Sequence, residues 1–411
     1  MSVLRRKLAR DLRRMVGQVV TIALVVGAGI AAFVSMRGNH ASLVEARDRY
    51  YERSRFADVF VHLERAPRVV RDELERLPGV ARVEPRVKAG ATLPLDGRTR
   101  PVSAVVISLP QGRQPSLNAV HLTSGRLVEA GRTDEVVLLD AFAEAHQLGP
   151  GDAIPAILDG VKRSLRVVGT GLSPEYVMAL DPGSMTQDPK AFAVLWMGED
   201  AVAAAYRLEG AFNDVSVDLR PGARLEATKD RIDRVLEPYG GLGAVARARQ
   251  PSNLIIEGEL LQLESMSTVV PGIFLAVAAM LLNVVLSRLV HLQRPQIATL
   301  KAVGYTDWEV GLHFFQLVSV VALLGAAIGL GLGTWMGSGL TALYAGYFKF
   351  PSLRFSLHLG SVVAALGISL GAAFAGAFFT VRRVMALPPA EAMRPPAPVR
   401  YRRSVIDVLG L

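Results

Sequence analysis

Residues 15–36 read MVGQVVTIALVVGAGIAAFVSM and contain no Asp, Glu, Lys or Arg. Three further stretches share this property, at residues 265–287, 310–348 and 355–381. A helix needs about 20 apolar residues to cross a hydrocarbon core of about 30 Å, and each stretch is at least that long. The sequence therefore predicts an α-helical membrane protein with four transmembrane helices and one large polar block, residues 37–266, between helices 1 and 2.

Basic side chains beside these stretches predict the orientation, because Lys and Arg in short flanking segments are retained in the cytoplasm. The basic flanks are Arg5, Arg6, Lys7, Arg10, Arg13 and Arg14 before the first stretch, Arg288, Arg294 and Lys301 between the second and third, and Arg382, Arg383, Arg394, Arg400, Arg402 and Arg403 after the fourth. We expect a multi-pass protein of the cell (inner) membrane, with both termini cytoplasmic and the large domain extracytoplasmic.

The charge is divided unevenly along the chain. Residues 37–266 hold 29 Lys and Arg against 32 Asp and Glu, a net charge of −3, and the remaining residues hold 17 against 5, a net charge of +12. Nucleic-acid binding would need basic residues clustered on one folded face. The excess instead sits at the membrane edges, so no nucleic-acid partner is expected. Cysteine is absent, which excludes disulfides and thiolate metal sites.

These patterns predict the order of segments. They are a cytoplasmic amphipathic segment (1–14), transmembrane helix 1 (15–36), an extracytoplasmic domain with stalk helices (37–266), transmembrane helix 2 (267–287), a cytoplasmic connection (288–310), transmembrane helix 3 (311–347), a short outer loop (348–354), transmembrane helix 4 (355–381) and a cytoplasmic tail or linker (382–411). Helix 3 is longer than one crossing needs, so we expect it to bend near Trp335 or to run past the bilayer surface.

The first segment carries Leu4, Leu8 and Leu12 at a spacing of four residues among basic side chains. This spacing places the leucines on one helical face, so the segment is expected to lie on the inner membrane surface. A simple topology signal is the alternative.

The polar block has the pattern of a mixed α+β domain. Residues 58–63, 80–87 and 102–107 are rich in apolar and β-branched residues and predict strands, with a turn at Asp96-Gly97. Pro67 at a first helical position predicts a helix over residues 68–77, and residues 225–236 predict another. A β-rich subdomain is expected at about residues 122–176. Helices over residues 41–56 and from Pro251 onward would form two stalks, with Pro271 a possible kink.

Catalytic and transport motifs are missing from this sequence. No Gly-Lys dipeptide occurs, so the chain has no phosphate-binding loop and is not expected to be an enzyme. The seven histidines show no metal-binding spacing. Asp and Glu are absent from all four apolar stretches, which argues against ion-coupled transport. No cofactor is expected in this chain, and energy would come from a partner.

Small residues recur every fourth position in two of the apolar stretches. They are Ala23, Gly27, Ala31 and Ser35 in the first, and Gly325, Gly329, Gly333 and Gly337 in the third. Small residues at this spacing let helices approach closely in lipid. Tight helix packing is therefore predicted, either within the chain or across a dimer.

The connection between the second and third stretches contains QIATLKAVGY at residues 296–305. Ile297, Leu300 and Val303 would present apolar groups on a short helix that ends at Gly304. A plain loop would not need this pattern, although a connecting helix without further function remains an alternative.

This arrangement resembles the FtsX-like permease family of ABC transporters, of the MacB and LolC/LolE type, also called type VII. Residues 296–305 are similar to a cytoplasmic stretch of that family, and residues 389–394 (PAEAMR) to the ending after its last span. Residues 79–85 (GVARVEP), 124–126 (SGR), 135–139 (EVVLL) and 148–152 (LGPGD) are similar to its periplasmic core domain. The resemblance covers nearly the whole chain.

The resemblance implies a permease subunit that couples a partner ATPase, which binds the ATP, to motion of the extracytoplasmic domain. The implied contacts with the ATPase are Gln296, Ile297, Thr299, Leu300, Lys301, Val303 and Gly304. The implied substrate is a lipid, lipoprotein, peptide or drug-like molecule that is exported or extracted. Partners would include the ATPase, a second permease copy or half, membrane lipids and, in some systems, a membrane-fusion adaptor.

The sequence departs from the family pattern at two places, which affect the implied ATPase contact and the expected length of the permease. Gln296 stands where the family often has Glu, which removes a charge from the implied contact. Residues 395–411 resemble the linker of longer, duplicated relatives, so the chain is either a half-length permease or the front half of a larger one. The alternative function is an FtsX-like membrane regulator or sensor that controls an envelope or cell-wall enzyme.

Overall fold

The computed structural model describes residues 3–95, 101–180 and 188–385, which form two compact units. We call one the helical unit. It holds the described residues up to Gly38, Glu264–Ser338, and the described residues from Ser356 onward. We call the other the α/β unit, and it holds Asn39–Leu263 and Gly339–Phe355. The predicted turn at Asp96-Gly97 and the segment at residues 389–394 lie outside the described residues.

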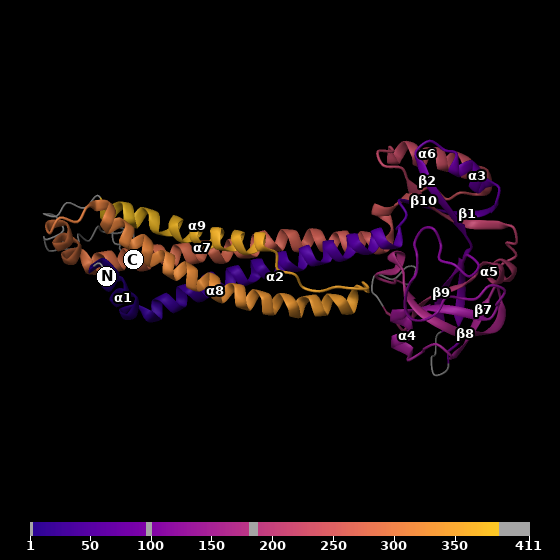
Figure 1. The fold of residues 1–411 in the computed structure, drawn as a ribbon, viewed down its shortest axis with the longest axis horizontal. Coiled ribbons are helices and arrows are strands. Elements are labelled where there is room, and N and C mark those ends of the chain that lie inside the picture. The colour runs from indigo at the N-terminus through magenta and orange to yellow at the C-terminus, as the bar shows by residue number, and fades with distance from the viewer. Residues whose placement is uncertain (1–2, 96–100, 181–187, 386–411) are drawn as a thin grey trace, which may run out of the picture. The chain divides into compact units, whose positions relative to one another are not determined.

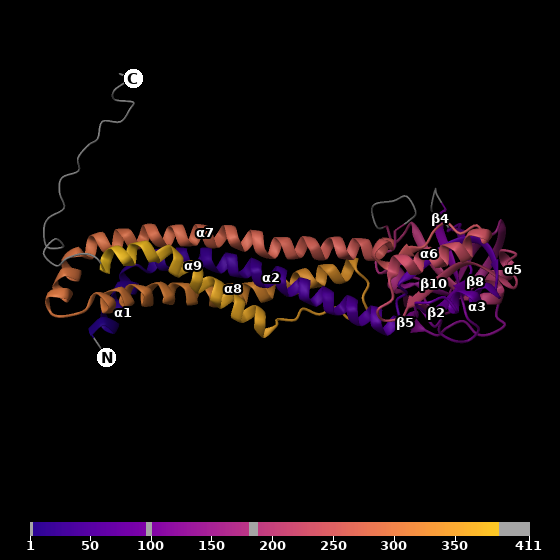
Figure 2. The ribbon, with the colours of Figure 1, turned by 90° about the horizontal axis from the view of Figure 1, so that it is seen from above.

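Five long helices account for the helical unit and for parts of the α/β unit. They are α1 (Val3–Arg14), α2 (Val16–Ser54), α7 (Pro251–Ala302), α8 (Asp307–Tyr347) and α9 (Leu359–Met385). The last four each contain an apolar window long enough to cross a membrane, and Figures 1 and 2 show them running alongside one another. The predicted class of four apolar helices with an α+β domain after the first is confirmed.

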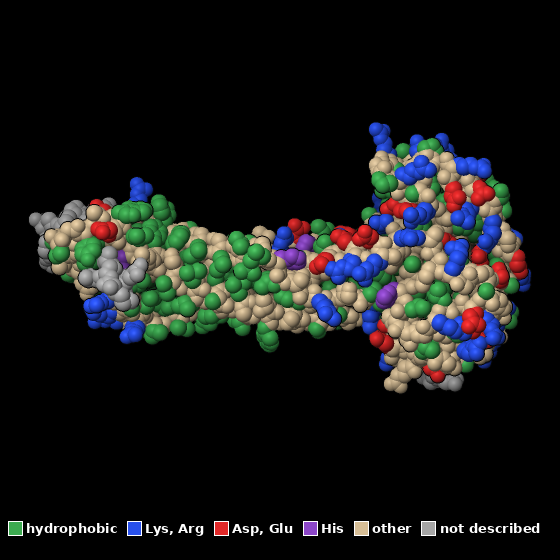
Figure 3. Space-filling view, in the orientation of Figure 1, with side chains coloured by type: hydrophobic (Ala, Val, Ile, Leu, Met, Phe, Trp, Pro, Cys, Tyr) green, Lys and Arg blue, Asp and Glu red, His purple; other side chains and the backbone are tan. Residues whose placement is uncertain are grey.

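Apolar side chains are divided between the inside and the outside of the helical unit. Ile30, Val318 and Ala322 are fully buried between the helices, whereas Ile273 and Phe379 are more than half exposed. Figure 3 shows hydrophobic side chains gathered on the visible surface of this unit. Because helices satisfy their own backbone hydrogen bonds, such a surface is stable in lipid.

Three helices are longer than one membrane crossing needs, as expected from the two stalk segments and from the long third apolar stretch. Helix α2 continues without a break to Ser54, and α7 continues through both Pro271 and Pro295 to Ala302. Helix α8 runs from Asp307 to Tyr347 with no interruption at Trp335, and it contains no proline that would break it.

The α/β unit begins with a four-stranded antiparallel sheet in the order β11-β1-β10-β2. Its strands are β1 (Val59–Pro67), β2 (Val80–Arg86), β10 (Ala211–Leu219) and β11 (Val245–Ala246). Helices α3 (Val70–Glu75) and α6 (Leu225–Leu236) pack their buried side chains into the same core. Pro67 pairs with Ala211 as the last residue of β1, so the expected helix start at Pro67 was wrong.

A seven-stranded sheet forms the rest of this unit, in the order β5-β8-β6-β9-β4-β3-β7. Its strands are β3 (Lys88–Leu93), β4 (Val102–Leu109), β5 (His121–Gly125), β6 (Glu135–Leu139), β7 (Ala153–Leu158), β8 (Val161–Leu172) and β9 (Phe192–Gly198). An additional pairing of β7 with β8 closes six of these strands into a ring. Helices α4 (Asp140–His146) and α5 (Glu199–Ala205) contact the strands.

This sheet extends beyond the expected β-rich subdomain of residues 122–176. Strands β3 and β4 precede that range and β9 follows it, because β9 pairs in parallel with β4 and antiparallel with β6. Long-range pairings of this kind leave no local signal in the sequence. Three short 3₁₀ turns complete the unit, η1 (Pro174–Tyr176), η2 (Glu237–Tyr239) and η3 (Arg247–Arg249).

A buried ion network joins the four-stranded sheet to the segment after β8. Arg86 donates from Nε to Asp214 Oδ1 at 2.5 Å and from Nη2 to Glu175 Oε2 at 2.8 Å. All three side chains are less than 10% exposed. Burial alone would raise the pKa of Asp214, but the charge of Arg86 outweighs it and holds that pKa well below its usual range.

Candidate functional site

The turn between α7 and α8 contains most of the sequence-predicted site. Residues 296–302 are the last turns of α7 and not a separate short helix, which corrects that expectation. Gly304 takes φ +104°, a left-handed conformation that favours glycine, and Tyr305 N donates to Leu300 O at 3.1 Å. These features end the helix immediately before α8 begins.

The start of α8 is closed by a reciprocal cap. Thr306 N donates to Glu309 Oε2 at 2.9 Å, and Glu309 N donates to Thr306 Oγ1 at 3.3 Å. This pattern satisfies two backbone donors that the first helical turn would leave free. The turn is therefore fixed from both sides and presents its side chains in a defined way.

The predicted contact residues divide into exposed and buried groups. Gln296 and Thr299 are exposed, and Val303 is 75% exposed. Ile297 is buried in the core of the helical unit, so it positions the helix and cannot reach a partner directly. Leu300 is half-buried.

Lys301 is held inside the helical unit. Its Nζ donates to the carbonyls of Val384 and Met385 at 3.2 and 3.0 Å and pairs with Asp307 Oδ1 at 2.7 Å. These carbonyls end α9, where a positive charge is favourable. Lys301 therefore links α7, α8 and the end of α9, a role that its place in the sequence motif did not indicate.

A groove of about 510 Å³ lies between α1 and the end of α7. It is lined by Arg6, Lys7, Arg10, Asp11 and Arg14 from α1 and by Gln296, Thr299 and Leu300 from α7. Basic side chains outnumber acidic ones four to one in this lining. The groove thus combines three of the sequence-predicted residues with basic residues that had been assigned only to topology.

Buried polar contacts fix α1 against its neighbours. Asp11 accepts from Lys7 Nζ at 2.5 Å and from Gln293 Nε2 at 3.2 Å, and His313 Nε2 lies 3.4 Å from Asp11 Oδ2. Burial raises the pKa of Asp11, but the contacts with His313 and Lys7 lower this pKa by more than burial raises it. The pKa of Asp11 therefore lies below its ordinary value. Leu8 and Leu12 pack on the helical core. Leu8 and Leu12, which were expected to face the inner membrane surface, therefore pack against the other helices.

The small residues bring α2 and α8 together within one chain. A Cβ placed on Gly329 would lie 2.6 Å from Ile30 Cβ and 2.7 Å from the carbonyl oxygen of Gly27. A Cβ on Gly333 would lie 2.9 Å from the carbonyl oxygen of Ala31. Gly325 approaches the Ala23 carbonyl in the same way. Of the two kinds of contact expected, the structure shows the one within the chain at these positions.

Sequence reasoning missed two features of this region. Trp308 is 65% exposed and directly follows the turn, next to a segment that was already singled out. Gly376 of α9 would meet the backbone of Ala279 on α7 if it carried a Cβ. The small residues of α9 at a spacing of four, among them Ala372 and Gly376, were the sequence signal for this contact. Among the described residues, no group of three or more His, Cys, Asp or Glu side chains could hold a metal ion.

Comparison with known families agrees with this architecture. A model of the FtsX-like permease C-terminal region matches residues 268–389, and a model of the MacB-like periplasmic core domain matches residues 6–235, more than half of the chain. The chain belongs to the FtsX-like permease family of ABC transporters and carries a MacB-like periplasmic core domain. It is thus a membrane protein with a domain of the extracytoplasmic type.

Individual relatives are distant. The uncharacterized ABC transporter permease protein Rv0987 of Mycobacterium tuberculosis is 24% identical over 284 residues, which are 67% of this chain and 30% of that protein. The periplasmic region of MacB from Actinobacillus actinomycetemcomitans is 11% identical with a TM-score of 0.30, over 49% of this chain and 92% of that structure. The extracellular domain of the noncanonic ABC-type transporter YknZ from Gram-positive bacteria is 11% identical with a TM-score of 0.31, over 46% and 98%.

Proposed function

We propose that this chain is a permease subunit whose α7–α8 turn binds a partner ATPase in the cytoplasm. The observation that carries the proposal is the pair of exposed apolar side chains at this turn, Val303 and Trp308, which are 75% and 65% exposed beside a groove lined mainly by basic residues. Neighbouring exposed apolar groups commonly mark an interaction site. Trp308 would also suit the headgroup layer of a membrane, so Val303 is the more specific indicator.

The groove beside this turn supplies complementary charge. Four basic side chains of α1 line it together with Gln296, Thr299 and Leu300. An acidic segment of the ATPase would be attracted there, and the uncharged Gln296 adds no negative charge that would oppose this attraction. The basic flanks place the groove, both termini and the turn on the cytoplasmic side in this proposal.

We further propose that the permease transmits motion and does not form a pore. Helices α2, α7 and α8 each contribute residues to both the helical unit and the α/β unit. A displacement at the α7–α8 turn would therefore be carried along rigid backbone toward the extracytoplasmic domain. A second permease copy or half would complete the transporter, and its lipid, lipoprotein, peptide or drug-like substrate would not cross the bilayer through this chain.

Association with the ATPase tests the binding surface. Val303→Asp should reduce co-purification with the partner ATPase at least tenfold, because a charge replaces the central apolar contact. Val161→Asp is the matched control, since Val161 is 55% exposed on β8 of the α/β unit. Equal recovery of the ATPase with both variants, at equal membrane expression, would remove the assignment of this surface.

A further inference from the structure

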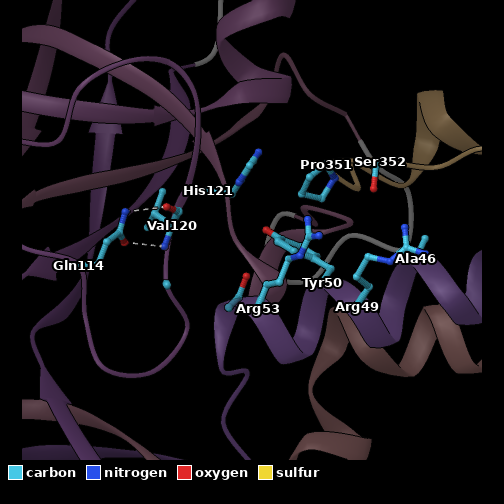
Figure 4. A pocket seen from close by; sticks show the side chains of 11 residues that line it. Ala46, Arg49, Tyr50, Arg53, Gln114, Val120, His121, Pro351 and Ser352 are labelled. Carbon is cyan, nitrogen blue, oxygen red and sulfur yellow. Dashed lines mark hydrogen bonds between the residues drawn. The ribbon is translucent and has the colours of Figure 1, made fainter.

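The α/β unit contains a pocket of about 220 Å³ beside the end of α2. Arg49, Tyr50 and Arg53 of α2 form one wall, and His121 and Pro351 lie across from them, as Figure 4 shows. The chain folds this way because the loop before β5 returns to α2. Within that loop Gln114 and Val120 exchange two hydrogen bonds of 2.8 and 3.0 Å, which shape the far wall.

The pocket is lined by positive and neutral side chains. Its lining residues include no Asp or Glu. Arg49 pairs with Glu45 one turn earlier, but both side chains remain nearly half exposed. Arg53 makes no ion pair with any residue that the structure describes. Arg53 therefore gives this helical face a positive potential that no carboxylate in the lining offsets, and Arg49 adds to it in part, because Glu45 shares its charge.

A buried hydroxyl group in the same wall is poorly paired. Tyr50 is only 4% exposed, and its hydroxyl makes no hydrogen bond of full geometry with the described residues. Its one polar contact is a weak side-chain hydrogen bond with Ser54. Phe350 holds the ring edge-on, with the ring centroids 6.2 Å apart. Buried polar groups are normally well paired, so a donor with only this weak contact, beside two arginines, indicates a ligand that accepts hydrogen bonds.

We infer that this pocket binds a small phosphate-type oxyanion. The guanidinium groups of Arg49 and Arg53 would pair with its charge, and the Tyr50 hydroxyl would donate to one of its oxygens. The size of the pocket favours a small group, because sites for drug-sized molecules are usually about 300–1,000 Å³. This binding site is independent of the contact with an ATPase.

The position of Tyr50 along α2 favours an anion from solution over a lipid headgroup. Tyr50 lies fourteen residues beyond Met36, the last residue of the uncharged stretch. At 1.5 Å per residue this is about 20 Å along the helix. The headgroup layer extends only about 5–8 Å beyond the hydrocarbon core. A lipid seated in the bilayer would have to be lifted out to reach this pocket.

Calorimetric titration of the detergent-solubilised full chain with inorganic phosphate tests the inference. Phosphate should bind saturably, and Arg53→Gln should weaken binding about tenfold or more. Tyr50→Phe should also weaken binding, while its melting temperature without phosphate should stay equal or rise, because the poorly paired hydroxyl is removed. The control is Arg76→Gln, an exposed arginine at the end of α3 that should leave binding unchanged.

The possible results separate the sources of the anion. The same affinity for phosphate in Arg53→Gln and Arg76→Gln, or no saturable binding to the wild-type chain, would overturn the inference. The affinity for phosphate, titrated in a phosphate-free buffer, should also be the same in phosphatidylcholine nanodiscs and in phosphatidylglycerol nanodiscs. If instead the phosphatidylglycerol discs compete with phosphate, the site takes a lipid headgroup and the assignment to a soluble anion is wrong.

Discussion

Two glycines of α8, two residues apart, should respond in opposite ways to the same substitution. Gly329 faces α2, where an added Cβ would lie 2.6 Å from Ile30 Cβ. Gly331 is exposed and a Cβ there would meet nothing within 4 Å. Gly329→Ala and Gly331→Ala therefore share their effect on helix propensity and differ only in packing.

The magnitudes follow from these distances. Carbon atoms pack best at about 3.5–4.0 Å, so α2 and α8 would have to separate by about 1 Å around Gly329→Ala. Overpacking of this kind costs about 1–3 kcal/mol. The gain in helix propensity is at most about 1 kcal/mol. The free energy of unfolding should thus fall by about 1–2 kcal/mol in Gly329→Ala and rise by about 0.5–1 kcal/mol in Gly331→Ala.

Unfolding of the full chain in mixed micelles with increasing dodecyl sulfate measures both effects. Trp308 and Trp335 both lie on α8, so their fluorescence reports on this helix once Trp196 of β9, the third tryptophan, is replaced by Phe in every variant. The dodecyl sulfate fraction at which half of the chain is unfolded should fall for Gly329→Ala and rise slightly for Gly331→Ala. Equal shifts in the same direction would refute the close approach of α2 and α8.

Three further predictions concern charged groups. Arg86→Leu should destabilise the α/β unit by about 3–5 kcal/mol in urea unfolding, because it leaves two buried carboxylates without a partner. Hydrogen bonds from Arg126 lower the pKa of Glu135 from 4.5 to about 2, so this group stabilises the fold above pH 4.5 and the contribution is lost as pH falls toward 2. Acid unfolding should therefore be less steep in that window for Glu135→Gln. Lys301→Met should lower the melting temperature by removing the cap of α9, with faster hydrogen exchange at residues 380–385 as its signature.

The four apolar helices could be predicted from the sequence because their signals are local. Each uncharged stretch is continuous in the chain, and the repeat that contains Gly325 and Gly329 directly encodes a flat helical face. The glycine repeat of α8 could not reveal that α2 is the helix it packs against, because that contact joins residues far apart in the sequence.

The site was only partly predictable for the same reason. The motif at residues 296–305 marked the turn between α7 and α8, but the sequence could not show that Lys301 bonds to the end of α9 or that Ile297 is buried. The groove and the pocket beside Tyr50 each combine residues from distant parts of the chain. The closed ring of strands depends on β7 and β9 pairing with strands far from them in the sequence, so it left no local pattern.

A distance measurement across the chain tests the central claim of transmitted motion most directly. Because the chain has no cysteine, Arg76→Cys in the α/β unit and Gly331→Cys in the helical unit would give two unique sites for spin labels. The labelled chain, diluted with unlabelled chain and assembled with its ATPase in nanodiscs, is measured by double electron–electron resonance without nucleotide and with ATP and vanadate. If motion is transmitted between the units, the distance distribution between the two labels should change with nucleotide. Superimposable distributions in a complex that hydrolyses ATP would contradict it.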